Sequence, residues 1–343
     1  MKRDSSNITP TKIGIVGLGL IGGSIAKRLG PSSVVGAFDT NLETLRSAEA
    51  EGFKTYSSIR ELAENVEIIF VATPMPEMSD VFDQIDTASN ASELLVSDVG
   101  SVKSTTRQLV LSKKRSWKFI GGHPMAGTES FGFSAASSDL LRGARWVLCI
   151  EEDTDFNSFL KLVEIITRDI GARVVPLESS VHDLAVANIS HLPYVVSSAL
   201  SQMVDSSPSH NLFYQLAAGS FRDATRVSGT PPTLSRDMCY QNRDSLIPVV
   251  REYIQLLESL YQDLQLSVNT GVSTFFEKGN HARNRYLSAN DDSSVLIVNL
   301  GESEEILKAK VIELGRLGGT ITKALDLENQ KALEFLVPHQ SNL

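Results

Sequence analysis

The sequence predicts an α/β protein built in three parts: an N-terminal doubly wound parallel sheet, an all-helical middle part and a small C-terminal α/β tail. Short apolar runs alternate with helical stretches over residues 12–177, as in a mostly parallel sheet with helices on both faces. Helical periodicity then fills residues 178–290. Over residues 291–343 strand-like and helical runs alternate again, which predicts a small tail after the helices.

Seven short apolar runs are the expected strands of the first part. They lie at residues 13–16, 34–38, 67–72, 94–97, 118–120, 145–150 and 172–175. Polar segments that carry glycine or proline directly follow three of them, at residues 72–74, 97–101 and 121–124. Because ligands bind at the carboxyl ends of parallel strands, we expect these three segments to line a binding site.

A glycine fingerprint joins the first expected strand to the helix after it. Gly17, Gly19 and Gly22 have the G-x-G-x-x-G spacing, and Asp39 follows the second expected strand, about 20 residues on. This order is typical of a Rossmann-type dinucleotide-binding unit, although glycines also mark ordinary turns. Gly17 permits the tight turn, Gly19 lets the backbone approach a pyrophosphate, and Gly22 lets the helix lie close to the strand.

The acidic residue indicates which dinucleotide binds. The Asp39 carboxylate accepts hydrogen bonds from ribose hydroxyls and repels a 2′-phosphate, which favours NAD over NADP. The fingerprint itself also serves FAD, so it predicts a nucleotide and not a reaction. The predicted cofactor is NAD, and its predicted ligands are Gly17, Leu18, Gly19, Leu20, Ile21, Gly22, Asp39, Thr73 and Pro74.

Composition argues against several classes of protein. A net charge of −9 disfavours nucleic-acid binding, which usually needs a basic patch. The two cysteines, Cys149 and Cys239, are far apart and lack metal-ligand spacing, which is typical of free thiols in a reducing compartment. No run of 18 apolar residues occurs, and the first eleven residues are polar, unlike a signal peptide. We therefore expect a cytoplasmic protein of two or three domains that binds no membrane and no metal.

The middle part is expected to hold four helices, at residues 180–204, 209–221, 235–263 and 266–289, with breaks at 206–208 and 229–232. Many alanines and leucines around the second and third helices suit close packing, within one subunit or between two. In the tail, strands are expected at 294–300, 320–325 and 332–337, and a helix at 302–315.

One of the six histidines stands in an unusual setting. His123 lies in the segment G-G-H-P-M-A-G-T-E, in a loop after an expected strand, where a core side chain is poorly placed. An imidazole titrates near neutrality and can take a proton from a hydroxyl while hydride leaves the same carbon. The alternative is a histidine that only satisfies backbone groups of its loop.

Two further histidines, His182 and His191, lie nine residues apart in an expected helix. Nine residues correspond to about 900° of rotation, so the two side chains point to opposite faces of a regular helix and cannot share a metal ion. We expect one of them to be structural and the other to face the cleft.

Several segments, in this order along the chain, resemble one known family. They are G-L-G-L-I-G-G-S at residues 17–24, D-V-G-S-V-K at 98–103, G-H-P-M-A-G-T-E at 122–129, H-D at 182–183 and S-H-L-P at 190–193. Together they are similar to the prephenate and arogenate dehydrogenases of tyrosine biosynthesis, over roughly residues 12–289. The third and fifth segments are far more specific than the glycine fingerprint.

The resemblance implies the oxidation of a cyclohexadienol: hydride leaves the hydroxyl-bearing ring carbon for the nicotinamide, the ring carboxylate departs as carbon dioxide, and the ring becomes aromatic. His123 matches the family's catalytic histidine, and Ser101 matches a serine that contacts the same hydroxyl and orients the histidine. Arg226, in the pattern G-x-F-x-D-x-T-R, matches an arginine that binds a substrate carboxylate. We interpret Arg222 in the same segment as part of a surface or intersubunit ion pair.

Other positions concern the mouth and the far end of the substrate pocket. Glu129 matches a residue that in some members gates the entrance through an ion pair, and the alternative is an exposed loop carboxylate. His191 and Tyr194 are predicted to contact substrate, and Tyr194 stands where some prephenate-using members carry a second histidine. Ser235 stands where some members place a tryptophan from the neighbouring subunit. Because Tyr194 and Ser235 differ from the residues of those members, both prephenate and arogenate stay open as substrates.

The resemblance also implies a homodimer, whose helical middle part serves dimerisation and substrate binding. The tail has the element order of a shortened regulatory ACT-like domain but no recognisable ligand motif, so a structural or dimer-stabilising role is equally open. The leading expectation is an NAD-dependent prephenate dehydrogenase. The alternatives are an arogenate dehydrogenase and a dinucleotide sensor that has lost catalysis, and the retained His123, Ser101 and Arg226 argue against the sensor.

Overall fold

The computed structural model describes residues 11–128, 130–288, 293–327 and 330–338. The chain divides into two compact units. The first unit consists of residues 1–179 and 294–337, and the second of residues 180–293 and 338–343.

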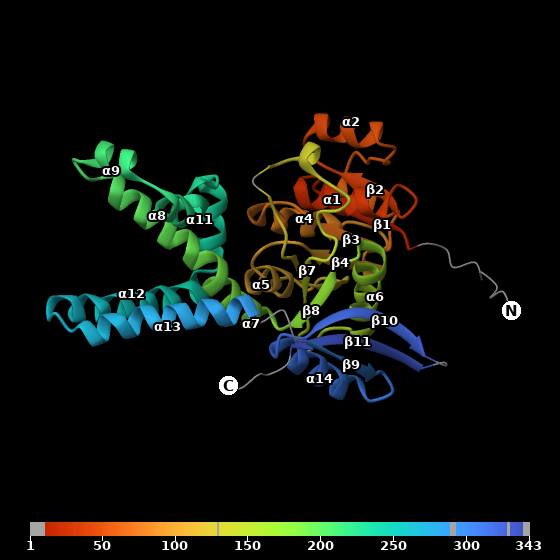
Figure 1. The fold of residues 1–343 in the computed structure, drawn as a ribbon. Coiled ribbons are helices and arrows are strands. Elements are labelled where there is room, and N and C mark those ends of the chain that lie inside the picture. Colours follow the sequence, from red (N-terminus) through yellow and green to blue (C-terminus); the bar gives the residue numbers. More distant parts are fainter. Residues whose placement is uncertain (1–10, 129, 289–292, 328–329, 339–343) are drawn as a thin grey trace. The chain divides into compact units, whose positions relative to one another are not determined.

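The first unit contains a five-stranded sheet in the order β2-β1-β3-β4-β5 (Figure 1). Its strands are β1 (Ile13–Val16), β2 (Val34–Phe38), β3 (Ile68–Val71), β4 (Leu95–Asp98) and β5 (Lys118–Ile120). All neighbouring strands run parallel. The strand order reverses at β1, because β2 lies on one side of it and β3 on the other. Open sheets of this kind bind ligands at that reversal, outside the carboxyl ends of the strands.

Both faces of this sheet are buried. Successive strand residues point to opposite faces, and on β3 Ile68 and Phe70 belong to one hydrophobic core while Ile69 and Val71 belong to another. The helices of this part of the chain are α1 (Leu20–Leu29), α2 (Leu42–Ala50), α3 (Ile59–Ala63), α4 (Met78–Ile85), α5 (Ser104–Ser112) and α6 (Phe156–Glu164). The predicted doubly wound parallel sheet is confirmed.

A second sheet of six strands, in the order β6-β7-β8-β10-β11-β9, completes the first unit. Its strands are β6 (Gly122–Pro124), β7 (Arg145–Cys149), β8 (Arg173–Leu177), β9 (Ser293–Asn299), β10 (Thr320–Leu327) and β11 (Gln330–Pro338). Thus β7 and β8 do not extend the parallel sheet, although the alternation of strands and helices favours one continuing sheet. The physical reason is that β6 pairs antiparallel to β7, so the chain starts a new sheet after β5.

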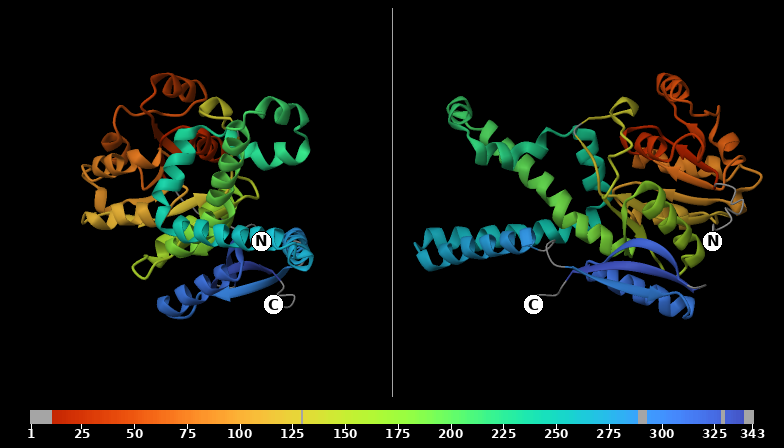
Figure 2. Two further views of the ribbon diagram at one scale, coloured as in Figure 1. Left: turned by 90° about the vertical axis from the view of Figure 1, so that its left-hand side faces the viewer. Right: turned by 45° about the vertical axis from the view of Figure 1, so that its right-hand side comes forward.

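The C-terminal tail joins this second sheet. Its predicted strand-helix-strand-strand order is present, with α14 (Glu304–Arg316) between β9 and β10. β10 pairs antiparallel with β8 through Ile321 and Val174, and α14 packs on the same strand. Figure 2 shows the helix and the strands of the tail together in blue. A Cβ on Gly315 would lie 1.8 Å from the Pro176 carbonyl oxygen, so glycine is required for this close approach.

The second unit is helical. Its helices are α7 (Ser179–Val186), α8 (Leu192–Asp205), α9 (His210–Leu216), α10 (Gly219–Thr225), α11 (Pro232–Gln241), α12 (Arg243–Gln265) and α13 (Asn269–Ser288). A π-helical turn, Ala187–His191, joins α7 to α8. None of the helices in the described part of the chain is long and apolar enough to cross a membrane.

Two of the expected helices are each divided in the structure. The helix expected at 209–221 is interrupted at Ala217, whose backbone is extended. The helix expected at 235–263 begins earlier, at Pro232, because the fixed φ of proline suits the first position of a helix. It is then interrupted at Asn242, where the backbone leaves the helical conformation.

Candidate active site

The three fingerprint glycines shape the loop between β1 and α1. Gly17 has a φ of +93°, in the region that favours glycine, and a Cβ there would lie 2.7 Å from the Ala72 carbonyl oxygen. A Cβ on Gly22 would lie 1.9 Å from the Gly17 carbonyl oxygen, so α1 can approach the loop only at glycine. Gly19 is the N-cap of α1, and the space around its missing Cβ is open. This is the backbone arrangement that the fingerprint predicts for a phosphate site.

Asp39 is fixed to the glycine loop. One of its carboxylate oxygens accepts a 2.7 Å hydrogen bond from the Leu18 N–H, and the other accepts a 2.8 Å bond from the Asn41 N–H. These bonds orient the carboxylate at the carboxyl end of β2. Because an ionised carboxylate offers about four acceptor positions, both oxygens can still accept hydrogen bonds from ribose hydroxyls.

A pocket of about 820 Å³ opens at the carboxyl ends of β1, β2 and β3. Seven of the predicted cofactor residues line it, namely Gly17, Gly19, Leu20, Ile21, Asp39, Thr73 and Pro74. The other two, Leu18 and Gly22, are buried. Glu77, Asp80 and Phe131 also line the pocket and carry no sequence signal. No lysine or arginine is among the described residues of its wall, and its volume lies in the usual range for a ligand site.

A second pocket, of about 430 Å³, lies beside α5 and β5 and is lined by charged side chains. Four cations of its wall have acidic partners, in the pairs Arg107–Asp153, Lys113–Asp83, Arg115–Asp86 and Lys118–Asp155. The fingerprint glycines Gly17 and Gly19 line the larger pocket and not this one.

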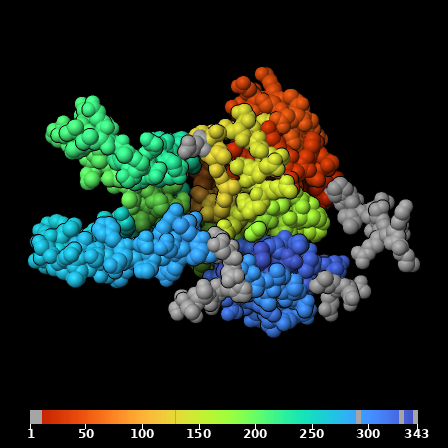
Figure 3. Space-filling model, viewed as in Figure 1, coloured from red at the N-terminus to blue at the C-terminus, as the bar shows by residue number. Residues whose placement is uncertain are grey.

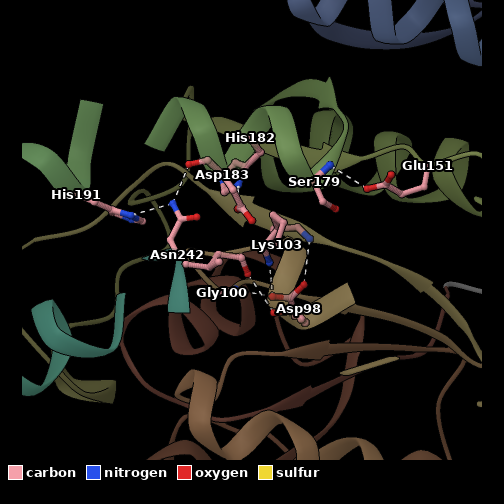
Figure 4. Close-up of polar contacts among 12 residues, drawn as sticks. Asp98, Gly100, Lys103, Glu151, Ser179, His182, Asp183, His191 and Asn242 are labelled. Carbon is pink, nitrogen blue, oxygen red and sulfur yellow. Dashed lines mark hydrogen bonds and ion pairs between the residues drawn. The ribbon is translucent and has the colours of Figure 1, made fainter. Parts of the chain in front are cut away.

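A buried ion pair lies at the end of β4. Lys103 Nζ contacts the Asp98 carboxylate, and neither side chain is exposed to solvent (Figure 4). Asp98 accepts hydrogen bonds from the N–H groups of Gly100, at 2.9 Å, and Gly122, at 3.3 Å. Lys103 donates to the Gly122 carbonyl oxygen at 2.6 Å. The pair therefore fastens two separate segments of the first unit to each other.

Ser101 and His123 each directly follow one of these fastened glycines. Ser101 lies between β4 and α5 and is half-buried. His123 is half-buried and lies on the short strand β6, opposite Val147 of β7, so its expected position in a loop is wrong. The antiparallel pairing of β6 with β7 holds this backbone extended. The ion pair thus fixes the peptide in front of each predicted catalytic side chain, a role that local sequence does not reveal.

His182 and His191 of the second unit are both buried. The helix between them is not regular, because it contains the π-helical turn Ala187–His191, so the rotation expected for a regular helix does not apply. His182 Nδ1 lies 2.8 Å from Asp183 Oδ1, and His191 Nδ1 lies 3.0 Å from Asn242 Nδ2. Burial, partly offset by the charge of Asp183, lowers the pKa of His191 to about 4. The His191 ring is therefore neutral near pH 7.

The remaining predicted site residues are spread over the second unit. Arg226 begins the short turn Arg226–Gly229 after α10 and is exposed, and Tyr194 is half-buried near the start of α8. His191 is hydrogen-bonded to Asn242. Glu129 lies outside the described residues.

Within the described residues, no group of three or more His, Cys, Asp or Glu side chains could hold a metal ion. Both cysteines are free. Burial raises the pKa of the Cys149 thiol to about 12, so this thiol is not a nucleophile at neutral pH.

Two family models match the chain, one after the other. Residues 22–176 match the nucleotide-binding domain of prephenate dehydrogenase, and residues 178–275 match the prephenate dehydrogenase dimerization domain. The chain belongs to the prephenate dehydrogenase family. It is therefore an oxidoreductase with a nucleotide-binding domain followed by a dimerization domain.

Individual members of this prephenate dehydrogenase family cover most of the chain. The prephenate dehydrogenase of Lactococcus lactis is 30% identical over 280 residues, which are 79% of this chain and 76% of that protein. The structure of Synechocystis arogenate dehydrogenase is 30% identical with a TM-score of 0.70, over 80% of this chain and 100% of that chain. Prephenate dehydrogenase from Aquifex aeolicus, in complex with hydroxyphenyl propionate and NAD+, is 25% identical with a TM-score of 0.73, over 82% and 99%.

Proposed function

We propose that this chain is an NAD-dependent prephenate dehydrogenase, which converts prephenate to 4-hydroxyphenylpyruvate in tyrosine biosynthesis by oxidative decarboxylation. The observation that carries the proposal is the Asp98–Lys103 ion pair, which ties the segments of Ser101 and His123 together. The ion pair lies within residues 22–176, which match the nucleotide-binding domain of prephenate dehydrogenase, and residues 178–275 match its dimerization domain.

The pocket at the glycine loop fits NAD. The open space at Gly19, at the start of α1, suits the pyrophosphate, and the fixed carboxylate of Asp39 suits the ribose hydroxyls. Thr73 and Pro74 form the wall at the end of β3. When bound, NAD supplies the acceptor for the hydride.

His123 is proposed to polarise the ring hydroxyl of the substrate. Its neutral imidazole accepts a hydrogen bond from that hydroxyl and takes up proton character as the carbinol carbon loses hydride. Ser101 hydrogen-bonds the same hydroxyl and orients the imidazole. The bond between the ring and its carboxylate breaks, carbon dioxide leaves, and the released electron pair completes the aromatic ring.

Arogenate is the second candidate substrate. It is favoured by the likeness to Synechocystis arogenate dehydrogenase and by Tyr194, which replaces a histidine found in some prephenate-using members. Initial rates with prephenate and with arogenate, each with NAD and with NADP, test both proposals. A higher kcat/KM with arogenate would transfer the assignment to that substrate, and no turnover of either would favour a sensor that has lost catalysis.

NAD is expected to be preferred over NADP. The Asp39 carboxylate is held by two backbone bonds and cannot turn away from a 2′-phosphate, and Glu77 and Asp80 add negative charge to the pocket. This like-charge contact should cost about 1 to 3 kcal/mol, or about fivefold to 150-fold in affinity. The ratio of kcat/KM for the two cofactors measures it. Asp39→Asn should lower the ratio of kcat/KM with NAD to kcat/KM with NADP. An equal kcat/KM with both cofactors in the wild type would show that Asp39 does not contact the ribose.

Arg226 is proposed to bind a carboxylate of the substrate through parallel hydrogen bonds, with His191 and Tyr194 toward the substrate side chain and Glu129 at the entrance. Because this carboxylate is remote from the reacting carbon, Arg226→Ala should raise KM for prephenate with little change in kcat. Losing a charged hydrogen-bonding partner costs about 1.5 to 3 kcal/mol, or roughly 10- to 150-fold.

Arg222→Ala is the matched control for Arg226→Ala, because Arg222 is exposed on the preceding helix α10. This control should leave KM nearly unchanged. An Arg226→Ala enzyme with the wild-type KM would show that another cation binds the carboxylate.

A homodimer is proposed, with α12 in the interface. Ile247, Ile254, Leu257, Tyr261 and Leu264 are exposed on α12 and spaced by three, four or seven residues, which places them along one stripe. Figure 3 shows one face of the α12–α13 pair in cyan and blue. An exposed apolar stripe of this length is typical of a protein interface, and this helix lies within the matched dimerization domain. Sedimentation equilibrium should give twice the mass of one chain.

The proposed location is the cytoplasm. Both cysteines are free, and cysteine side chains stay reduced in a reducing compartment such as the cytoplasm.

A further inference from the structure

Asn242 connects Asp183 of α7 to His191 at the end of the π-helical turn. Its amide nitrogen Nδ2 donates a 2.8 Å hydrogen bond to the Asp183 carbonyl oxygen and lies 3.0 Å from His191 Nδ1 (Figure 4). All three residues are at most 3% exposed. A carbonyl oxygen can only accept a hydrogen bond, so the amide of Asn242 must turn its nitrogen, and not its oxygen, toward both partners.

This orientation fixes the proton on the His191 ring. An amide nitrogen only donates, so His191 Nδ1 must accept from Asn242, and the proton of the neutral ring must lie on Nε2. Within the described residues His191 has no hydrogen-bond partner at Nε2. The charged or titratable groups that act on the ring are Asp183, which favours its protonation, and His182, which opposes it.

His182, in the same helical segment, is held in the opposite way. Its Nδ1 lies 2.8 Å from the Asp183 carboxylate, which only accepts, so His182 Nδ1 carries a proton. The carboxylate of Asp183 therefore accepts a hydrogen bond from His182. Its backbone carbonyl accepts one from the Asn242 amide, which in turn donates to His191. One aspartate thus contributes to the protonation of both rings.

We propose that Asn242 is a positioning residue that locks His191 as a neutral Nε2–H donor, which offers a hydrogen bond to a carbonyl or carboxylate oxygen of the substrate and does not act as a base. The tautomer follows from the second unit alone. The acceptor on the substrate rests on the proposed function, which places His191 in the substrate site.

The tautomer is tested by ¹⁵N spectra of the full-length protein labelled at histidine, with His191→Gln to assign the His191 signals. From pH 8 down to about 5 we expect His191 Nδ1 to have the ¹⁵N chemical shift of an unprotonated ring nitrogen, and Nε2 that of a protonated one. His182 should show a protonated Nδ1 and serves as the internal contrast. A protonated Nδ1 on His191 in the wild type would overturn the proposal, and this measurement needs no variant of Asn242.

Asn242→Asp changes the partner of His191 from a donor to an acceptor. We expect the ring proton to move to Nδ1 in this variant, and the ring to titrate at a higher pH because a new carboxylate faces it. A His191 spectrum unchanged by Asn242→Asp, in a protein with wild-type circular dichroism, would show that Asn242 does not set the tautomer.

The donor role is tested by two replacements of His191. A glutamine places its amide nitrogen near the position of Nε2, and an asparagine places it near Nδ1. We expect His191→Gln to keep KM for prephenate within about threefold and His191→Asn to raise it about tenfold, with kcat little changed in both. Unchanged KM in both variants would remove the donor role, and a loss of kcat of about a hundredfold in both would indicate a base.

These outcomes separate the inference from the proposed function. If the wild-type enzyme does not oxidise prephenate, the proposed function fails, whereas the ¹⁵N spectra still decide the tautomer of His191.

Discussion

His123→Asn should lose roughly 10² to 10⁴ in kcat, the usual contribution of a positioned acid or base. NAD binding and folding should be retained, because the glycine loop and Asp39 follow β1 and β2, whereas His123 lies on β6 of the other sheet. Histidine titrates between about pH 5 and 8, and only the neutral ring accepts a proton, so the wild-type rate should fall on the acid side of that range. This fall in rate at low pH, the acid limb of the pH–rate profile, should be absent in the variant.

His281→Asn is the control for His123→Asn, because His281 is exposed on α13, and it should keep both the wild-type rate and the acid limb. His191 cannot supply a limb near neutrality, since burial lowers its pKa to about 4. Near-normal turnover of His123→Asn with the same acid limb would assign proton transfer to another group.

Lys103→Met should lower the free energy of unfolding by about 3 to 5 kcal/mol, because it leaves the Asp98 carboxylate buried without its partner. Urea denaturation measures this loss as a lower midpoint. The double variant Asp98→Asn with Lys103→Met removes both charges at nearly constant volume, so it should be more stable than Lys103→Met alone. It should still have a reduced kcat, because the segments before Ser101 and His123 are no longer held by an ion pair.

Lys118→Met provides the comparison for an exposed pair. Lys118 Nζ lies 3.1 Å from Asp155 Oδ2, and both side chains are more than a third exposed. Losing such a pair should change the free energy of unfolding by about 0 to 1 kcal/mol. If Lys103→Met costs no more than Lys118→Met, the Asp98–Lys103 pair does not fasten the two segments.

The sequence predicts the parts of the fold that have local signals. The strands β1 to β5 are short apolar runs between helices, and Gly17, Gly22 and Asp39 occupy the positions that the fingerprint requires. The second sheet could not be predicted in this way, because it pairs Ile321 with Val174 across a long stretch of chain. The strands expected at 172–175 and 320–325 are present, but the pattern within each segment does not show which distant strand it pairs with.

The supporting residues of the site were missed for a similar reason. Asp98 and Lys103 lie in the segment D-V-G-S-V-K at residues 98–103, but only the folded structure shows that both charges are buried next to Gly122. Asn242 interrupts a predicted helix, and its partner His191 is about fifty residues earlier in the chain. The π-helical turn before α8 also has no glycine or proline to mark it.

The stoichiometry of prephenate oxidation tests the proposed function in a single measurement. Purified protein is mixed with prephenate and excess NAD, and NADH, carbon dioxide and 4-hydroxyphenylpyruvate are measured as prephenate disappears. We expect one equivalent of each product per prephenate consumed, and a rate that is abolished or strongly reduced in His123→Asn. Loss of prephenate without NADH, or no loss of prephenate at all, would contradict the proposed function.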